Sequence, residues 1–490
     1  MATERPATSR SAGRALWVIL GVAFLVRLIV VVAALRDPSI PPSTDNYVGM
    51  AELWLEEGYY SKVEWPPAYT FLAKLLLLSV GKGPIFHTLL TLHLLCGTAS
   101  VWFVWRIAGL LGLEPRACLL GAAIAALEPS AVIHTGLALT ETLYVFVLTG
   151  SLFALLWSLS AEGAASTRRG LVSGIGMALG SLLRFVGLPV AVAMGIWTAL
   201  TGPVSRRRKR LIICALLSVP VALANIAWAT RNYVDLGHFE IHSSGGHNLA
   251  VMWVGPARVM HERLPVNSYN CLYVWTPEEL GEHWDSPDKF AQSQAMARAA
   301  VKWALAHPLE IVAGLLRSSA MLWFGPGRAP WEKITGMDPL PVWLNGMLYL
   351  FHFAFAILTA IGLWCWWSGR PEARAGLVLV FLMIAVHQLS LGCSGYNRYL
   401  VPIVPFASML AAVALIDVSR YLRSSFAHMK QSGWLEPEAR PRREQVPSEQ
   451  RPSQETDFGL RGLLTDIGKT GDAEEPDEEG ATADDTTRKE

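Results

Sequence analysis

An apolar stretch with a single charged residue, Arg27, follows a short basic N-terminus and reads ALWVILGVAFLVRLIVVVAAL at residues 15–35. About 20 apolar residues are enough for one helix to cross the hydrocarbon core of a bilayer. A helix is expected because it satisfies its own backbone hydrogen bonds in lipid. The stretch is too long for a signal-peptide core, and no small-residue cleavage site follows it. We therefore expect a retained first span.

Similar apolar blocks recur along the chain, in which hydrophobic residue types make up 52% and charged types only 17% of 490 residues. This balance is too apolar for an ordinary soluble protein of that length. The sequence therefore predicts an all-α polytopic membrane protein. The blocks lie at about residues 15–35, 66–80, 85–107, 116–133, 138–160, 170–184, 186–202, 211–229, 309–324, 343–367, 376–393 and 399–421.

Two of these blocks are expected to stay out of the membrane core. The basic run at residues 206–210 should face the cytoplasm, because cytoplasmic loops are rich in Lys and Arg. A span at residues 66–80 would turn that run outward, so this block is better explained as an interfacial or re-entrant helix. The block at 309–324 is short and is excluded on the same logic. About ten transmembrane helices remain, with both termini inside.

Three regions follow from this orientation. Residues 1–14 form a cytoplasmic N-terminus, and residues 15–423 form the transmembrane domain. Its two long polar stretches, at about 36–84 and 231–308, face the periplasm or exterior. The part from Gln431 onward carries eight Lys/Arg against sixteen Asp/Glu, so residues 424–490 are expected to be a disordered, acidic cytoplasmic tail.

The first polar stretch offers one carboxylate near the membrane surface. It reads STDNYVGMA at residues 43–51 and continues to Gly58. Ser43 or Thr44 can cap a short helix that ends at about Glu57, with Gly58 as its stop. Asp45 would then lie in the first helical turn, where it can take a proton from an incoming nucleophile. An acid in this position can equally serve only to cap the helix.

The order of residues in this stretch resembles that of a known superfamily. An Asp is followed by Tyr, Ala, Gly-Tyr and then an aromatic-Pro-Pro group, at Asp45, Tyr47, Ala51, 58–59 and 65–67. The pattern, placed after a first span, resembles the GT-C superfamily of membrane glycosyltransferases, and in it the protein mannosyltransferase-like and aminoarabinose transferase-like enzymes. The resemblance implies that Asp45 is the catalytic carboxylate. The family often has Glu at the next position, where this chain has Asn46, which weakens the assignment to the protein-mannosylating branch.

Further segments match the same superfamily in the same order. LEPS at 127–130 with TETL at 140–143 is similar to its "SP…E-x-L" stretch. RNY at 231–233 and the residues up to 249 are similar to "RNY…G-x-F…GG-x-NL", and NRYLVP at 397–402 is similar to "RYLLP". The resemblance covers residues 15–421 and implies an inverting transferase. Its sugar would move from a polyprenyl-phosphate carrier to a lipid, glycan or protein acceptor.

Three arginines are expected at outer-surface depth, where the positive-inside bias does not place them. Arg231, Arg398 and Arg184 each lie at the outer end of an expected span. A departing phosphate needs nearby positive charge, and the planar guanidinium suits a phosphate well. We assign the three to donor-phosphate binding. The alternative is that each side chain only snorkels to the membrane surface.

Several other residues are assigned to the acceptor site or to the support of Asp45 and the three arginines. Glu141 can pair with an arginine or orient the acceptor, or it can only compensate the charge of a helix N-terminus. The loops at residues 57–69 and 237–249 are expected to shape the acceptor site. The residues assigned to it are Glu141, Tyr47, Tyr60, His247 and Asn248. Arg27 inside the first span and His387 are better explained as structural.

No cofactor or metal is expected. His238, His242, His247 and His261 are irregularly spaced, and the missing acid at Asn46 argues against a carboxylate-bound divalent ion. The expected partners are the lipid-linked donor, its acceptor and membrane lipids, and no nucleic-acid motif is present. The expected location is a cell membrane, the bacterial inner membrane, with the active site facing the periplasm or exterior.

Two other classes of function remain open. A transporter or flippase of lipid-linked sugars would share the spans and the outer arginines, but it predicts an inverted repeat with a midplane site. A catalytically inactive scaffold would use the acidic tail to recruit a partner. The sugar, the acceptor and the pathway are not readable from the sequence.

Overall fold

The computed structural model describes residues 10–36, 45–263, 274–283, 286–325, 327–392 and 397–431. The chain divides after Phe426, and the fold below belongs to the first unit, Met1–Phe426. Within the described residues every regular element is a helix. The elements are α1 Arg10–Ala34, α2 Tyr47–Glu57, α3 Pro67–Val80, α4 Ile85–Leu110, α5 Pro115–Leu127, α6 Pro129–Ile133, η1 His134–Gly136, α7 Thr140–Ser160, α8 Gly163–Leu183, α9 Gly187–Leu200, η2 Val204–Arg206, α10 Arg207–Leu236, α11 Ser244–Asn248, η3 Leu249–Val254, α12 Gly255–His261, α13 Pro277–Leu280, η5 Gly281–His283, α14 Lys289–Ala306, α15 Pro308–Phe324, α16 Arg328–Thr335, α17 Val342–Gly369, η6 Pro371–Ala373, α18 Arg374–Leu391, η7 Asn397–Tyr399 and α19 Val404–Gln431.

The all-α polytopic class is confirmed, although the number of clear spans is smaller than ten. Among the described residues, six helices are long and apolar enough to cross a membrane, or up to eight if each of two bent pairs is one span. Each of the ten expected segments still coincides with a helix or a bent pair. Three fail the length or composition test. α9 has 14 residues, α18 is one of the shorter apolar helices, and α8 carries Arg168 and Arg169 in its second turn.

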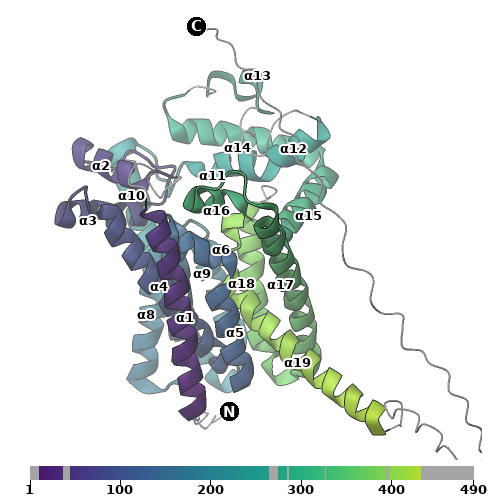
Figure 1. Ribbon diagram of the computed structural model, residues 1–490. Coiled ribbons are helices and arrows are strands. Elements are labelled where there is room, and N and C mark those ends of the chain that lie inside the picture. Colours follow the sequence, from purple (N-terminus) through teal and green to yellow (C-terminus); the bar gives the residue numbers. More distant parts are fainter. Residues whose placement is uncertain are drawn as a thin grey trace, which may run out of the picture. The chain divides into compact units, whose positions relative to one another are not determined.

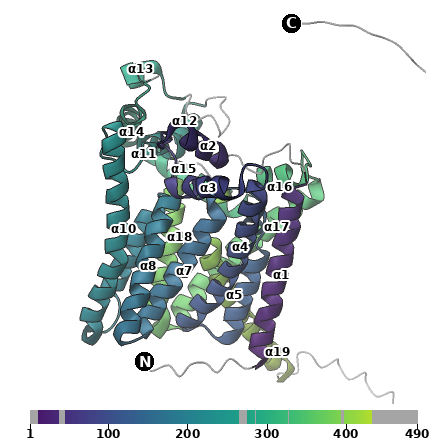
Figure 2. The same cartoon turned by 90° about the vertical axis from the view of Figure 1, so that its left-hand side faces the viewer.

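The long polar stretches gather at one end of the bundle. Figures 1 and 2 show α2, α3, α11, α12, α14 and α16 at the end opposite the start of α1. The basic start of α10 lies at the same end as the start of α1. This arrangement agrees with the grouping that the charges predict. Which end faces the cell exterior remains a prediction.

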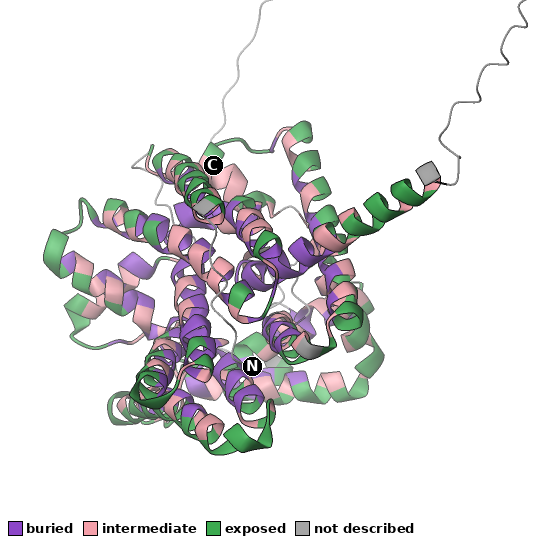
Figure 3. Ribbon diagram, turned by 90° about the horizontal axis from the view of Figure 1, so that it is seen from below, coloured by how far each residue is buried: buried purple, intermediate pink, exposed green. Residues whose placement is uncertain are grey.

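The helices pack through small residues and keep their large apolar side chains for the outside. A Cβ on Gly174 of α8 would lie 2.1 Å from Leu216 O of α10, and one on Gly362 of α17 would lie 1.8 Å from Leu410 O of α19. Only glycine permits such close contact between helices. Figure 3 shows buried faces turned inward and exposed faces outward. Outward apolar residues such as Trp17, which is 75% exposed, are suited to lipid.

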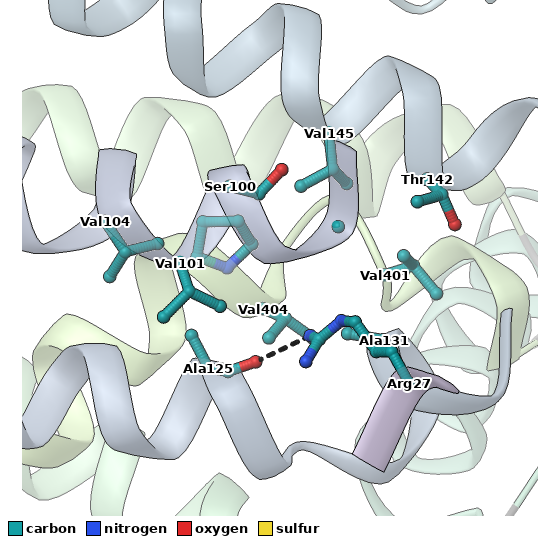
Figure 4. Close-up of a pocket in the computed structure, with 12 residues that line it drawn as sticks. Arg27, Ser100, Val101, Val104, Ala125, Ala131, Thr142, Val145, Val401 and Val404 are labelled. Atoms are coloured by element: carbon teal, nitrogen blue, oxygen red, sulfur yellow. Dashed lines mark hydrogen bonds between the residues drawn. The ribbon is translucent and has the colours of Figure 1, made fainter. Parts of the chain in front are cut away.

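Arg27 supports a break in the fourth expected span. α5 and α6 meet at Glu128 with a bend of 53°, because Pro129 cannot continue the hydrogen-bond pattern of α5. Arg27 donates to the freed carbonyls of Ala126 at 2.8 Å and Ala125 at 3.3 Å, and Glu128 Oε2 accepts from Ala131 N at 2.6 Å. Figure 4 shows Arg27 beside a cavity of about 30 Å³. The structural explanation of Arg27 is confirmed.

Two expected boundaries are wrong. The first short helix starts at Tyr47 and is capped by Asn46, whose side chain accepts a hydrogen bond from Gly49 N, so Asp45 precedes the helix instead of lying in its first turn. Asn46 caps well because it tolerates the left-handed conformation that it adopts here, at φ 41°. Ser43 and Thr44 lie outside the described residues. The last helix continues to Gln431, past the expected boundary at 423.

Candidate active site

Asp45 is held by the turn that starts α2. The next residue, Asn46, caps the helix, and Gly58 ends it in the left-handed conformation at φ 80°, as expected from the sequence. Tyr47, the first helical residue, is 3% exposed and packs edge-on against Trp65, with a ring-centroid distance of 5.7 Å. The buried Tyr47 therefore fixes the backbone on one side of Asp45.

Arg398 contacts Asp45 from the far end of the sequence. Its Nη1 atom lies 2.8 Å from Asp45 Oδ2, and the two side chains are 30% and 13% exposed, respectively. Arg398 belongs to η7, the short turn between α18 and α19. A charge-assisted hydrogen bond of this length is among the stronger polar contacts in proteins.

A second carboxylate and a second arginine extend this pair. Glu141 Oε1 lies 2.5 Å from Arg184 Nη1 and 3.6 Å from Arg398 Nε. The Glu141 side chain is 2% exposed and that of Arg184 is 10% exposed. Glu141 lies in the first turn of α7, and Arg184 is the residue after the last turn of α8. Asp45, Arg398, Glu141 and Arg184 form one continuous cluster, which we call the charge cluster.

One aromatic ring lies against both arginines of the charge cluster. The Tyr399 ring centroid is 5.1 Å from the Arg184 guanidinium and 5.4 Å from that of Arg398. Cation–π contacts of this kind attract a guanidinium without using its hydrogen-bond donors. The N–H groups of both arginines therefore remain available to bind carboxylates or an anion.

The structure brings together Asp45, Arg398, Arg184 and Glu141, but it engages Arg231 elsewhere. The Arg231 guanidinium donates to Tyr60 O at 2.7 Å and to Asn232 Oδ1 at 3.0 Å, and its Nε lies 2.8 Å from Asp235 Oδ2. Arg231 therefore ties the end of α10 to the first polar stretch. None of these contacts joins it to the charge cluster.

Three residues assigned to the acceptor site, Tyr60, His247 and Asn248, lie in the region where the two polar stretches meet. Tyr60 is 1% exposed and packs on Trp54 and Trp228, at ring-centroid distances of 4.8 and 5.8 Å. His247 and Asn248 are exposed at the end of α11. The stretches are joined by a backbone hydrogen bond from Ser243 N to Val63 O at 3.2 Å. Tyr60 supports this region, and His247 and Asn248 line its surface.

The histidines of the second polar stretch lie apart from one another. His238 pairs with Asp288 at 3.1 Å, His261 pairs with Glu310 at 3.2 Å, and His242 stacks on Phe185. Within the ranges that the structure describes, no group of three His, Cys, Asp or Glu residues is arranged to hold a metal ion.

His387 is a core residue, as the sequence predicts. Its Nε2 atom is 3.1 Å from the Tyr144 hydroxyl, and its Nδ1 atom is 2.6 Å from Met383 O. Both ring nitrogens thus have a partner, which explains how a histidine is accommodated among apolar side chains.

Lys333 of α16 was not among the residues selected from the sequence. Burial lowers the pKa of Lys333 from its usual value, and the Asp45 carboxylate partly opposes this shift. A lone lysine in a short segment between spans has no motif around it, so no sequence signal distinguishes it from a surface lysine. Tyr399 belongs to the NRYLVP segment, but its place against both arginines follows only from the fold.

The chain is similar to solved structures of archaeal oligosaccharyltransferases. One is AglB from Archaeoglobus fulgidus in complex with an inhibitory peptide and a dolichol-phosphate, at 14% identity and a TM-score of 0.49. The match covers 85% of this chain and 52% of that one. Another is the apo form of the oligosaccharyltransferase from the same organism, at 14% identity and a TM-score of 0.48, covering 84% of this chain and 52% of that one.

The chain thus spans about half the length of the solved structures that it matches. No family model matches the chain, and no curated protein matches it.

Proposed function

We propose that this chain is a membrane glycosyltransferase that moves a sugar from a polyprenyl-phosphate carrier to an acceptor at the outer face of the membrane. The observation that carries the proposal is the contact between Asp45 and Arg398, at 2.8 Å. It joins a carboxylate fit to act as a base with a cation fit to hold a phosphate. Asp45 lies just before α2, which is at the end of the bundle where the polar stretches gather.

The proposed step needs a base and a stabilised leaving group. The acceptor hydroxyl or amide attacks the anomeric carbon of the sugar, and Asp45 takes the proton that the nucleophile loses. The bond between that carbon and the phosphate oxygen breaks, and its electron pair stays on the phosphate. Attack from the face opposite the phosphate inverts the configuration of the sugar.

Arg398 and Arg184 are proposed to stabilise the phosphate as it leaves. Both guanidinium groups are already held by Glu141, at 3.6 and 2.5 Å, so they need little reorganisation when charge develops. A carboxylate shared by two arginines also lowers the repulsion between them. Glu141 is therefore a positioning residue in this proposal, and it does not touch the sugar.

Arg231 is proposed to support the acceptor side. Its hydrogen bond to Tyr60 O fixes the first polar stretch against α10. The assignment to the donor phosphate would require Arg231 to leave Tyr60, Asn232 and Asp235, which together occupy its guanidinium. The contacts therefore favour a role in shaping the acceptor site.

Mass spectrometry of membrane lipids and glycans, from cells with and without the protein, tests the proposal. Cells that lack it are expected to lose one sugar modification and to accumulate the unused polyprenyl-phosphate sugar. Wild-type protein should restore the modification. Identical lipid and glycan profiles in both cell types would contradict the proposal. Accumulation of the donor only in the inner leaflet would instead support a flippase.

A further inference from the structure

A groove lies between α17 and α18, away from the charge cluster. Its volume is about 410 Å³, which is within the range of small-ligand pockets, roughly 300–1,000 Å³. α18 has 18 residues, so its two ends are about 27 Å apart. The groove lies at the end where α18 begins, whereas Arg398 of the charge cluster follows the far end. We call it the α17–α18 groove, and it is not part of the site described above.

The two helices that form the groove are fixed by different neighbours. α17 packs closely on α19 through Gly362, and Arg370, the residue after α17, binds both carboxylate oxygens of Asp417 at 3.0 Å. The start of α18 is held by α9 instead, where Trp197 Nε1 donates to Ala375 O at 2.7 Å. The outer faces of α17 and α18 therefore leave a space between them.

Apolar side chains line the α17–α18 groove, and most of them are exposed. Trp364 is 72% exposed, and Trp367 and Phe381 are each 51% exposed. In a membrane, the molecules that contact such an outward apolar face are lipids. A space between apolar side chains forfeits van der Waals contacts unless a ligand fills it. The acyl chain of a lipid would fill this one.

A cation lies against one wall of the groove. Arg374, the first residue of α18, donates through Nε to Trp367 O at 3.0 Å, and its guanidinium lies 5.2 Å from the centroid of the Trp367 ring. Arg374 is exposed. Among the side chains that the structure describes, no carboxylate pairs with it, whereas Asp417 neutralises the nearby Arg370. The groove thus combines apolar walls with a guanidinium that lacks a counter-charge.

Two hydrogen bonds place the groove at the basic end of the bundle. Trp197, which bonds to Ala375 of α18, lies in the last turn of α9, and Arg210 of the basic start of α10 donates to Thr198 O at 2.7 Å. This is the end at which α1 starts (Figure 2). The sequence predicts that it faces the cytoplasm, and the cytoplasmic leaflet carries anionic lipids.

We propose that the α17–α18 groove binds one anionic phospholipid, with an acyl chain along Trp364 and Phe381 and the phosphate against Arg374. A guanidinium matches the geometry of a phosphate, and a basic residue near the membrane surface attracts an anionic headgroup. The lipid fills the groove and neutralises Arg374. The site is separate from the charge cluster, so the proposal does not depend on the proposed function.

Native mass spectrometry of the purified full-length protein tests the lipid site. The probes are phosphatidylglycerol, which is anionic, and phosphatidylcholine with the same acyl chains, and the measured quantity is the affinity of the first bound lipid. The wild type should bind phosphatidylglycerol about fivefold more tightly, the usual effect of one basic residue near an anionic lipid. Arg374→Ala and Arg374→Gln should each remove this preference. Arg374→Lys should keep most of it, because the charge remains.

Arg169→Ala is the matched control, because the Arg169 guanidinium also lies over a tryptophan ring, 3.5 Å from the centroid of Trp157. Trp157 does not line the groove, so this variant should keep the preference of the wild type. Thermal unfolding of each variant shows whether the fold is intact. If Arg374→Ala keeps the preference, or if the wild type binds both lipids equally, the proposal is overturned and the groove holds only unselected membrane lipid.

Ala360→Phe tests the place of the acyl chain, because Ala360 lines the groove and a larger side chain would fill it. Its affinity for phosphatidylglycerol should fall several-fold. Leu223→Phe, at an exposed position of α10, introduces the same ring elsewhere and should bind as the wild type does. Unchanged affinity in Ala360→Phe would show that the lipid does not enter the groove. Inorganic phosphate should not displace phosphatidylglycerol, and displacement would show that Arg374 binds a free phosphate instead of a lipid.

Discussion

The Nη1 atom of Arg398 lies 2.8 Å from Oδ2 of Asp45, although 353 residues separate the two in sequence. The pair joins the first polar stretch to the turn before the last helix. Its geometry therefore depends on the packing of the intervening helices. Glu141 and Arg184 extend the pair from the ends of α7 and α8.

Arg398→Lys should reduce sugar transfer by roughly tenfold to a hundredfold. One guanidinium reaches Asp45 through Nη1 and Glu141 through Nε, and the single ammonium of lysine cannot reproduce this fork. The measurement is kcat/KM for transfer by the purified protein. Arg420→Lys is the control, because Arg420 lies farther along α19, where it pairs with Glu114 and Asp417. Equal loss in both variants would show that Arg398 has no special role.

Glu141→Gln should lower the stability of the protein, because it leaves the nearly buried Arg184 without its carboxylate. Removing one partner of a buried ion pair typically costs roughly 3–5 kcal/mol. The double variant Glu141→Gln with Arg184→Met should recover much of this stability, since no unpaired guanidinium remains. It should not recover sugar transfer, because Arg184 is proposed to contact the phosphate. Thermal unfolding and a transfer assay on the same samples separate the two effects.

Recovery of transfer in the double variant would exclude Arg184 from phosphate binding. Unchanged stability in Glu141→Gln would instead mean that the Arg184 contact at 2.5 Å contributes little to the fold.

Gly49→Ala should disturb the start of α2. A Cβ at Gly49 would lie 2.5 Å from Asn46 Nδ2 and 2.6 Å from Asn46 Oδ1. The cap would be displaced, and Asp45 would move with it. We expect transfer to fall several-fold while overall stability drops by only about 1 kcal/mol, the usual effect of a lost cap.

A second substitution tests whether the clash is the cause. Asn46→Gly removes the side chain that clashes, and glycine tolerates the positive φ at this position. Gly49→Ala combined with Asn46→Gly should therefore transfer sugar faster than Gly49→Ala alone. If the second substitution brings no improvement, the explanation by the Asn46 side chain is wrong.

Acid should loosen the second polar stretch where His242 stacks on Phe185. Burial lowers the pKa of His242 from 6.5 to about 4, so the folded protein keeps this imidazole neutral. Between these two values the unfolded chain binds a proton that the folded chain does not. The stability that the packed His242 contributes is therefore fully present above about pH 6.5 and is lost progressively as the pH falls to about 4.

His242→Phe should keep the stacking without the titration. Its melting temperature is expected to fall less than that of the wild type between pH 6.5 and 4. Other titrating groups act equally in both proteins, so the difference between the two curves isolates His242. Parallel curves would show that His242 is not responsible.

The membrane fold could be predicted from the sequence because lipid imposes simple requirements. Apolar blocks of sufficient length mark spans, and the basic run at 206–210 fixes which polar stretches share a side. The structure places those stretches at one end of the bundle as expected. The bend at Glu128 was not predicted, although Pro129 and the intramembrane Arg27 are its visible signals.

The charge cluster could be predicted only in part. Arg398 and Arg184 were selected because arginines at outer-surface depth are unusual. Asp45 was selected from the family resemblance and Glu141 as a possible partner of an arginine, and the structure joins all four. Arg231 satisfied the same criterion as the other two arginines, but local partners such as Asp235 and the Tyr60 carbonyl engage it.

The most direct test of the account compares Asp45→Asn with Glu56→Gln in a transfer assay. The assay uses the purified protein and the polyprenyl-phosphate sugar that accumulates in cells lacking it. Glu56 is an exposed acid in the last turn of α2, so its replacement controls for loss of charge in the same stretch. Binding of polyprenyl monophosphate and thermal unfolding are measured in parallel.

Asp45→Asn is expected to slow transfer by about a hundredfold or more, the usual range for removal of a general base. It should still fold and bind polyprenyl monophosphate, and Glu56→Gln should transfer sugar at the wild-type rate. Transfer by Asp45→Asn at the wild-type rate, with the donor bound, would contradict the assignment of Asp45 as the base.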